Sequence, residues 1–106
     1  MEFIRINVDG ITAEIDPRVV RDYRTFVKLA NIAKAEEAGD EIQVLKAVPD
    51  FADSLFGREQ FARILDELAA RDGYADIDTV QRFIVEAFNA AARGDEAPHG
   101  DDLKNS

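Results

Sequence analysis

The side chains best suited to chemistry are few and far apart in this chain. His99 is the only histidine, and no cysteine is present. The sequence therefore offers no pair of histidine ligands for a metal, no thiol nucleophile and no convincing serine–histidine pairing. We expect no catalytic residues, no cofactor-binding residues and no metal ligands, which points to a protein that is not an enzyme.

Two pairs of carboxylates share a helical face, namely Asp50 with Asp53 and Asp66 with Glu67. Paired carboxylates can act as general acid and base when burial shifts the pKa of one member. Other charged residues surround both pairs here, which favours solvated polar faces. The glycines are isolated and form no phosphate-binding loop.

Length and composition predict one helical domain over residues 1–93 and a disordered acidic tail over 94–106. The chain has 106 residues, of which 46% are hydrophobic, and its formal net charge is −9. Such a charge argues against a nucleic-acid partner, because phosphate binding needs clustered Lys and Arg. No apolar run approaches the ~20 residues that span a bilayer, and the first residues do not resemble a signal peptide. We expect no membrane association and a cytoplasmic location, which the absence of cysteine also suits.

The charge is unevenly distributed along the chain. Residues 17–34 contain five basic residues and one acid, so they carry +4 and the remaining residues sum to −13. This basic segment could be a solvated helix face that pairs with the acidic surface of its own chain. It could also pair with another copy in a head-to-tail assembly.

The first element predicted is a β-hairpin. Residues 2–8 and 11–15 both alternate between apolar and polar side chains, and Asp9-Gly10 separates them. Asp-Gly between two alternating runs is typical of a two-residue hairpin turn. Because a lone hairpin is marginally stable in water, we expect it to lie on helices or to pair with a further strand. Its exposed edge is a candidate for self-contact.

A long helix is predicted over residues 17–37, with Asp16 as its N-cap and Pro17 in the first turn. Leu29 and Ile32 lie near its basic side, which suggests that something covers that face. The inner face of this helix is predicted to consist of Val19, Tyr23, Phe26, Ala30 and Ala33, flanked by Val20 and Val27.

Three further amphipathic segments follow between Asp40 and Phe88. The first begins at Asp40, and we expect it to kink or break at Pro49 and restart as a second short helix, because an interior proline costs ~3 kcal/mol. The second runs from about Arg58 to Ala70. The third begins at Asp76 and ends at Gly94.

The fold class predicted is mainly α, with an N-terminal β-hairpin followed by a small bundle of four or five helices. The predicted core comprises Tyr23, Phe26, Val27, Leu45, Val48, Phe51, Leu55, Phe61, Ile64, Leu65, Leu68, Val80, Phe83, Ile84 and Phe88.

One short motif resembles that of the acyl carrier proteins. Asp53-Ser54-Leu55 is similar to the Asp-Ser-Leu whose serine carries phosphopantetheine in that family, and Thr79-Val80-Gln81 also looks like a stretch near the end of such proteins. That family places its serine at the start of a helix, whereas Ser54 falls in the last turn of one. The resemblance makes Ser54 an alternative cofactor-attachment site.

A wider pattern resembles the tail assembly chaperones of long-tailed bacteriophages and prophages. A hairpin and a long helix are followed by Leu55-Phe56-Gly57-Arg58-Glu59-Gln60, similar to a Leu-Leu-Gly-x-Glu-Gln-like segment of that family. After Asp72-Gly73 comes a final helix built on Val80, Phe83, Ile84 and Phe88. The resemblance covers residues 40–92 well and residues 1–39 loosely.

This second resemblance implies a non-enzymatic protein that binds the long, helical tape measure protein and keeps it soluble during tail assembly in the host cytoplasm. It also implies self-association, because one small protein must cover a long client. A frameshifted longer form, as many members have, is compatible with the polar C-terminal segment. A third hypothesis is an acidic inhibitor that mimics nucleic acid. Such an inhibitor would bind a basic partner, and added salt would abolish that binding.

Overall fold

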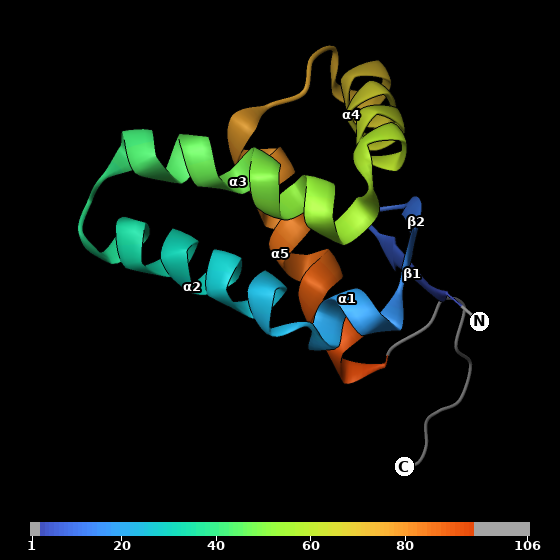
Figure 1. The fold of residues 1–106 in the computed structure, drawn as a ribbon. Coiled ribbons are helices and arrows are strands. Elements are labelled where there is room, and N and C mark those ends of the chain that lie inside the picture. The colour runs from blue at the N-terminus through green and yellow to red at the C-terminus, as the bar shows by residue number, and fades with distance from the viewer. Residues whose placement is uncertain (1–2, 95–106) are drawn as a thin grey trace.

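The computed structural model describes residues 3–94 and confirms the predicted mainly helical fold with an N-terminal hairpin (Figure 1). The predicted acidic tail lies outside the described residues from position 95 onward. No helix in the described range is long and apolar enough to cross a membrane. The elements are β1 (Ile4–Val8), β2 (Ile11–Ile15), α1 (Pro17–Arg21), α2 (Tyr23–Glu37), α3 (Glu41–Phe56), α4 (Arg58–Asp72) and α5 (Ile77–Arg93).

The hairpin forms as the sequence predicts. Asp9 and Gly10 both have positive φ, at 54° and 85°, as a two-residue turn that follows the twist of the strands requires. The strands pair antiparallel, with Ile6 opposite Ala13 and Val8 opposite Ile11. These four side chains and Ile15 are buried, so one face of the hairpin belongs to the core.

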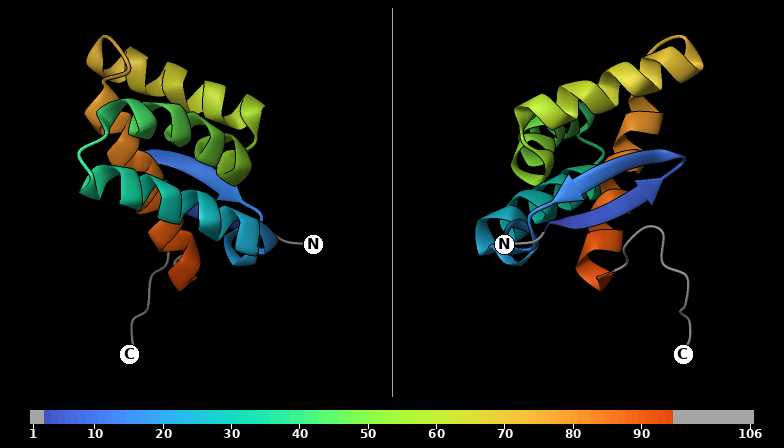
Figure 2. Two further views of the ribbon diagram at one scale, coloured as in Figure 1. Left: turned by 60° about the vertical axis from the view of Figure 1, so that its left-hand side comes forward. Right: turned by 90° about the vertical axis from the view of Figure 1, so that its right-hand side faces the viewer.

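The helices cover that apolar face of the hairpin. Helix α5 packs against β1, whereas α3 and α4 pack against β2 (Figure 2). Helix α2 lies along α3 on the side away from α4 (Figure 1). Aromatic rings join these layers, since Phe51 of α3 contacts Phe88 of α5 with ring centroids 5.6 Å apart. Phe56 lies 6.0 Å from Phe83 by the same measure.

The single helix predicted over residues 17–37 is wrong, because Asp22 divides it into α1 and α2. Asp22 has an extended backbone, with φ −76° and ψ 125°, and its carboxylate accepts a hydrogen bond from the backbone N–H of Arg24 at 2.9 Å. A short acidic side chain that binds the following backbone starts a new helix in preference to continuing the old one. Asp16 caps α1 in the same way, through Arg18 N–H.

The break changes which face of α2 points inward. The buried residues are Thr25, Ile32 and Ala35, with Leu29 partly buried beside them, so the face on which Leu29 and Ile32 lie is indeed covered. The predicted inner residues Tyr23, Phe26, Ala30 and Ala33 are exposed instead, as is the flanking Val27. The extended backbone at Asp22 interrupts the helical rotation, so the stripe that begins at Val19 does not continue along α2.

Helix α3 runs unbroken through Pro49, so the predicted restart at this residue is wrong. Pro49 is exposed, and the lost backbone hydrogen bond is offset by buried side chains on both sides of it. Gly57 then ends α3 with φ 83°, a conformation that favours glycine, and α4 begins at the next residue.

The rest of the predicted core agrees with the structure, with two corrections. Phe51, Ile64, Leu68 and Phe83 are almost completely buried, and the other predicted residues of α3, α4 and α5 are buried or partly buried apart from one. That exception is Leu45, which is 49% exposed. The hairpin side chains, absent from the predicted core, supply a large part of it.

Candidate functional site

A hollow of about 540 Å³ lies where the end of α2 meets the first turns of α3 and α5. Val44, Leu45 and Ile77 form its apolar part. Four carboxylates also line it: Glu36, Asp40, Glu41 and Asp78. Among the described residues that line this acid-rimmed hollow, none is basic.

The acids gather here because two helices begin at this place. Asp40 is the N-cap of α3 and accepts a hydrogen bond from Gln43 N–H at 3.1 Å, and Glu41 follows in the first turn. Asp78 occupies the first turn of α5, just after the N-cap Asp76. Acids stabilise helix starts by binding free N–H groups and by complementing the helix dipole. Helix starts thus supply three of the four acids of the rim, and Glu36 comes from the last turn of α2.

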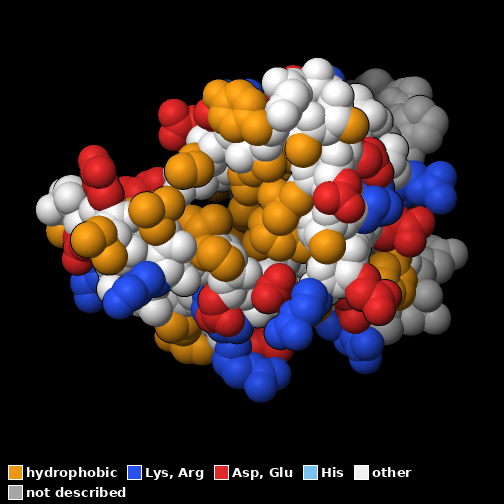
Figure 3. All heavy atoms as spheres, turned by 90° about the horizontal axis from the view of Figure 1, so that it is seen from above, with side chains coloured by type: hydrophobic (Ala, Val, Ile, Leu, Met, Phe, Trp, Pro, Cys, Tyr) orange, Lys and Arg blue, Asp and Glu red, His pale blue; other side chains and the backbone are white. Residues whose placement is uncertain are grey.

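Large apolar side chains remain uncovered around the same hollow. Ile77 is 59% exposed and Leu45 is 49% exposed, and both line the hollow. Ile42 is 68% exposed in the first turn of α3 and does not line it. Seen from above, the face of the molecule is hollowed and shows apolar side chains in and around the depression (Figure 3). Apolar surface that is concave and rimmed by polar groups is typical of a site that binds another chain.

The chemistry of this hollow suits an amphipathic helix with basic flanks. Apolar side chains of such a helix would contact Val44, Leu45 and Ile77, while Lys or Arg beside them would reach the acidic rim. Side chains that lose water on binding contribute most to affinity, and the rim charges contribute mainly to orientation and association rate.

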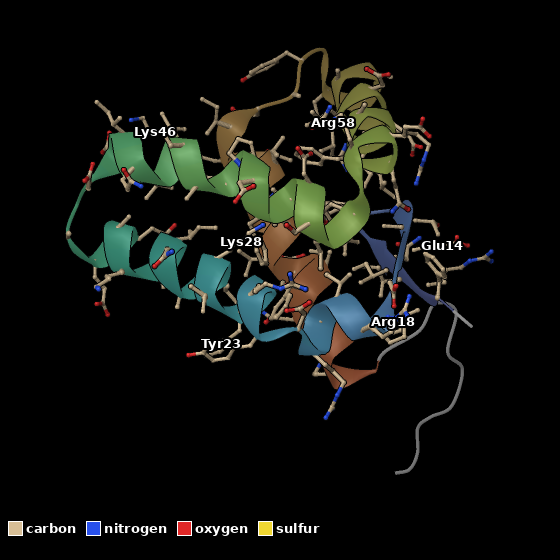
Figure 4. The ribbon with its side chains drawn as sticks, viewed as in Figure 1. Glu14, Arg18, Tyr23, Lys28, Lys46 and Arg58 are labelled. Carbon is tan, nitrogen blue, oxygen red and sulfur yellow. The ribbon has the colours of Figure 1, made fainter. Side chains whose placement is uncertain are left out.

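A second apolar surface lies on the outer side of α2. Tyr23 and Phe26 are exposed with their ring centroids 6.1 Å apart, and Tyr23 points away from the rest of the protein (Figure 4). The predicted basic face is partly neutralised here, because Arg24 pairs with the cap Asp22 at 2.9 Å. Hydrogen bonds from the Arg24 side chain and backbone lower the pKa of Asp22.

Ser54 lies in the last turn of α3, half-buried, where it accepts a hydrogen bond from Lys28 Nζ at 2.6 Å. Lys28 extends from α2 towards α3 and also pairs with Asp50 at 3.4 Å (Figure 4). This cluster links the two helices and keeps the ammonium group beside a carboxylate. The geometry is that of a helix–helix contact and differs from the exposed helix start on which a carrier protein presents its serine.

The other carboxylates considered for chemistry do not converge. Asp53 is half-buried on α3, whereas Asp66 is exposed on α4 and its neighbour Glu67 pairs with Arg63 one turn earlier. No group of three or more potential metal ligands occurs within the described residues. His99 lies outside them.

The sequence contained one signal for the hollow that the prediction missed. Acids at Asp40 and Asp76 mark two helix starts, but nothing local indicates that those starts meet in space. The spacing of Leu45 fits the apolar stripe of α3, which predicts a core position. Because α2 and α5 cover only part of that stripe, Leu45 remains half exposed. No protein-family model, curated protein or solved structure matches this chain.

Proposed function

We propose that this protein is a tail assembly chaperone of a bacteriophage or prophage, which binds the tape measure protein and keeps it soluble in the host cytoplasm. It acts by binding, without catalysis. The observation that carries the proposal is the acid-rimmed hollow, with Leu45 and Ile77 left exposed at its edge. The sequence resemblance over residues 40–92 adds the choice of client.

The hollow supports a helical client for energetic reasons. Fully burying one Leu or Ile side chain contributes about 1.5–3 kcal/mol, and Leu45 and Ile77 are already about half covered, so completing their burial adds roughly 2–3 kcal/mol. Micromolar binding corresponds to ~8 kcal/mol after the ordering cost, so a client must make several such contacts along its length. A tape measure protein is long and helical by the same resemblance, and it would present such stripes repeatedly. Weak individual contacts suit a chaperone whose client must later be released into the tail tube.

Self-association forms part of this proposal. One domain of this size covers only a short length of a long helix, so several copies would have to line up along the client. The net charge of −9 keeps such an assembly soluble while its apolar surfaces are engaged.

The test is co-expression with the tape measure protein, which we expect to be encoded by the long helical reading frame immediately downstream. The soluble fraction of the client should rise when the wild-type chaperone is present. Leu45→Glu and Ile77→Glu each place a charge at the edge of the hollow and should abolish that rise. Val85→Glu is the matched control, since Val85 is an exposed apolar residue of α5 outside the hollow.

The outcome can contradict the proposal in two ways. A client that stays insoluble with the wild-type protein would contradict the chaperone function. If all three variants solubilise the client as well as the wild type does, the chaperone function stands, but its binding site lies outside the acid-rimmed hollow.

A further inference from the structure

The two edges of the hairpin differ, because α4 closes only one of them. On the outer edge of β2, Gln60 bonds both backbone groups of Glu14, each at 2.8 Å. Arg63 donates to the carbonyl oxygen of Thr12 at 3.0 Å. Polar side chains of α4 thus take the place of a third strand along β2.

In the part of the chain that the structure describes, the outer edge of β1 has no such cover. Glu14 lies opposite Arg5 and Thr12 lies opposite Asn7. The backbone groups of Glu14 and the carbonyl oxygen of Thr12 point away from β1, towards α4. In an antiparallel pair, residues directly opposite each other point their backbone groups the same way relative to the pair, so those of Arg5 and Asn7 point away from β2. Within residues 3–94, nothing bonds the backbone N–H or C=O of Arg5 or Asn7.

The uncovered edge is accessible as well as unpaired. Arg5 and Asn7 are exposed, and a hollow of about 300 Å³ separates the end of β1 from the second half of α5. An open strand edge is a template for pairing with another strand, and native proteins commonly cover such edges. A two-stranded hairpin also gains stability from further strands.

We propose that β1 of a second copy occupies this edge, antiparallel, about a twofold axis at Ile6. Arg5 of each copy then lies opposite Asn7 of the other, and these two pairs exchange four backbone hydrogen bonds. Ile6 faces its own counterpart on the buried side. The result is a four-stranded sheet in the order β2–β1–β1–β2. In each copy, α4 already closes the outer edge at β2.

The sequence of β1 favours this register over its neighbours. A shift that centres the axis on Arg5 places two arginines directly opposite each other, which is destabilising. A shift that centres it on Asn7 leaves only one hydrogen-bonded residue pair within the strands, that of Asn7 with its own counterpart. One-residue slips would move Ile6 to the solvent face. The edge is therefore self-complementary in one arrangement.

This inference names the contact surface for the self-association included in the proposed function, and rests on that part alone. The edge lies beside the second half of α5, whereas the acid-rimmed hollow lies at its first turn. About ten residues at 1.5 Å each separate the two places along the helix, roughly 15 Å. A client and a second copy can therefore bind at the same time.

Disulfide trapping tests the register, because the natural chain contains no cysteine. Arg5→Cys and Asn7→Cys proteins are prepared separately, mixed in reduced form and then oxidised. In the proposed dimer their Cα atoms lie ~5.5 Å apart, within the range of a disulfide. Two copies of the same variant place their cysteines ~9 Å apart, which is too far. Thr12→Cys mixed with Glu14→Cys, on the closed edge, is the matched control.

We expect the wild-type chain to sediment as a dimer at raised concentration. The Arg5→Cys and Asn7→Cys mixture should give a covalent dimer several-fold faster than either variant alone and than the control mixture. Dimerisation of the wild type without this preferential cross-link would overturn the edge proposal and leave self-association standing. A wild-type chain that remains monomeric throughout would overturn both, whereas client solubilisation is measured separately and would still stand.

Discussion

The side-chain amide of Gln60 binds both backbone groups of Glu14, 46 positions earlier in the chain. Its Oε1 accepts from Glu14 N–H and its Nε2 donates to Glu14 C=O, both at 2.8 Å. A third bond runs from Nε2 to the carbonyl oxygen of Phe56 at the end of α3. One residue therefore fixes β2 to the junction between α3 and α4, and the start of α4 is positioned by the hairpin.

Replacement of Gln60 by Ala should cost about 1–2 kcal/mol of unfolding free energy. Net contributions of single hydrogen bonds are roughly 0.5–1.5 kcal/mol, and water can reach the freed groups at this exposed edge. Urea denaturation followed by circular dichroism measures the change. Asp66→Ala, at an exposed position in the middle of α4, should stay within ~0.5 kcal/mol of the parent. Equal effects at both positions would show that the amide contributes nothing specific.

Truncation to alanine should destabilise the protein strongly at Phe83 and hardly at all at Phe26. Phe83 is 1% exposed and packs against Phe56, so Phe83→Ala should destabilise the protein by about 3–5 kcal/mol. Phe26 is 57% exposed on α2, so Phe26→Ala should change stability by no more than ~0.5 kcal/mol. Thermal or urea unfolding of both variants checks this contrast. A large loss at Phe26 would mean that the outer face of α2 is covered in solution.

Stability should fall in acid partly through the N-cap of α5. The backbone N–H of Thr79 is the main cause that lowers the pKa of Asp76 below its usual 3.8, with the hydroxyls of Thr79 and Tyr74 acting in the same direction. A carboxyl whose pKa is lower in the folded state stabilises that state above the unfolded pKa. The contribution is lost as pH falls through the folded pKa, so the window lies below about pH 4.

The Asp76→Asn variant isolates this term, because asparagine still caps a helix but does not titrate. Its stability relative to wild type should be lowest at neutral pH and should recover towards wild type as the pH is lowered through that window. Asp66→Asn is the control, since Asp66 is exposed and makes no hydrogen bond or ion pair within the described residues. A difference between Asp76→Asn and wild type that stays constant with pH would contradict the assignment.

The capping hydrogen bond that Asp22 accepts should contribute more to stability than the negative charge of its carboxylate. Asp22→Ala removes the acceptor for Arg24 N–H and should cost about 0.5–2 kcal/mol. Asp22→Asn keeps an acceptor and should recover most of that loss, as measured by thermal unfolding. If both substitutions are equally harmful, the Arg24–Asp22 ion pair rather than the cap accounts for the break between α1 and α2.

Local chemistry explains which parts of the fold were predictable. Asp9-Gly10 specifies a turn, and Asp16, Asp40 and Asp76 specify helix starts, because each of these effects involves neighbouring residues only. The hairpin and the starts of α1, α3 and α5 followed from such signals. Apolar stripes then identified the core of α4 and α5 correctly, because each stripe there is regular and uninterrupted by polar residues.

Helix α2 shows why the rest was not predictable. Its true inner stripe includes Thr25 and Lys28, whereas the alternative stripe contains Tyr23 and Phe26. Thr25 is buried, and Lys28 is partly buried with its ammonium group in contact with Ser54 and Asp50 of α3. Only the neighbouring helix supplies those polar partners, so hydrophobicity alone selects the wrong face.

The candidate site depended even more on tertiary structure. Three acids of the rim, Asp40, Glu41 and Asp78, have a local reason to be where they are, because they lie at helix starts. The hollow itself exists because the first turns of two helices separated by more than thirty residues meet at the end of a third. Leu45 and Ile77 become a candidate binding surface only through that meeting. The sequence predicted the client class by resemblance and gave no indication of where the client would bind.

The most direct test is a titration of a purified helical segment of the tape measure protein with the wild-type chain, Leu45→Glu and Val85→Glu. We predict that wild type and Val85→Glu bind alike and that Leu45→Glu binds at least about tenfold more weakly, a loss of ~1.4 kcal/mol. Binding by the wild type should persist when salt shortens the Debye length from ~10 Å to ~3 Å, because apolar contacts provide most of the affinity. Undiminished binding by Leu45→Glu, or complete loss of wild-type binding in high salt, would contradict the account.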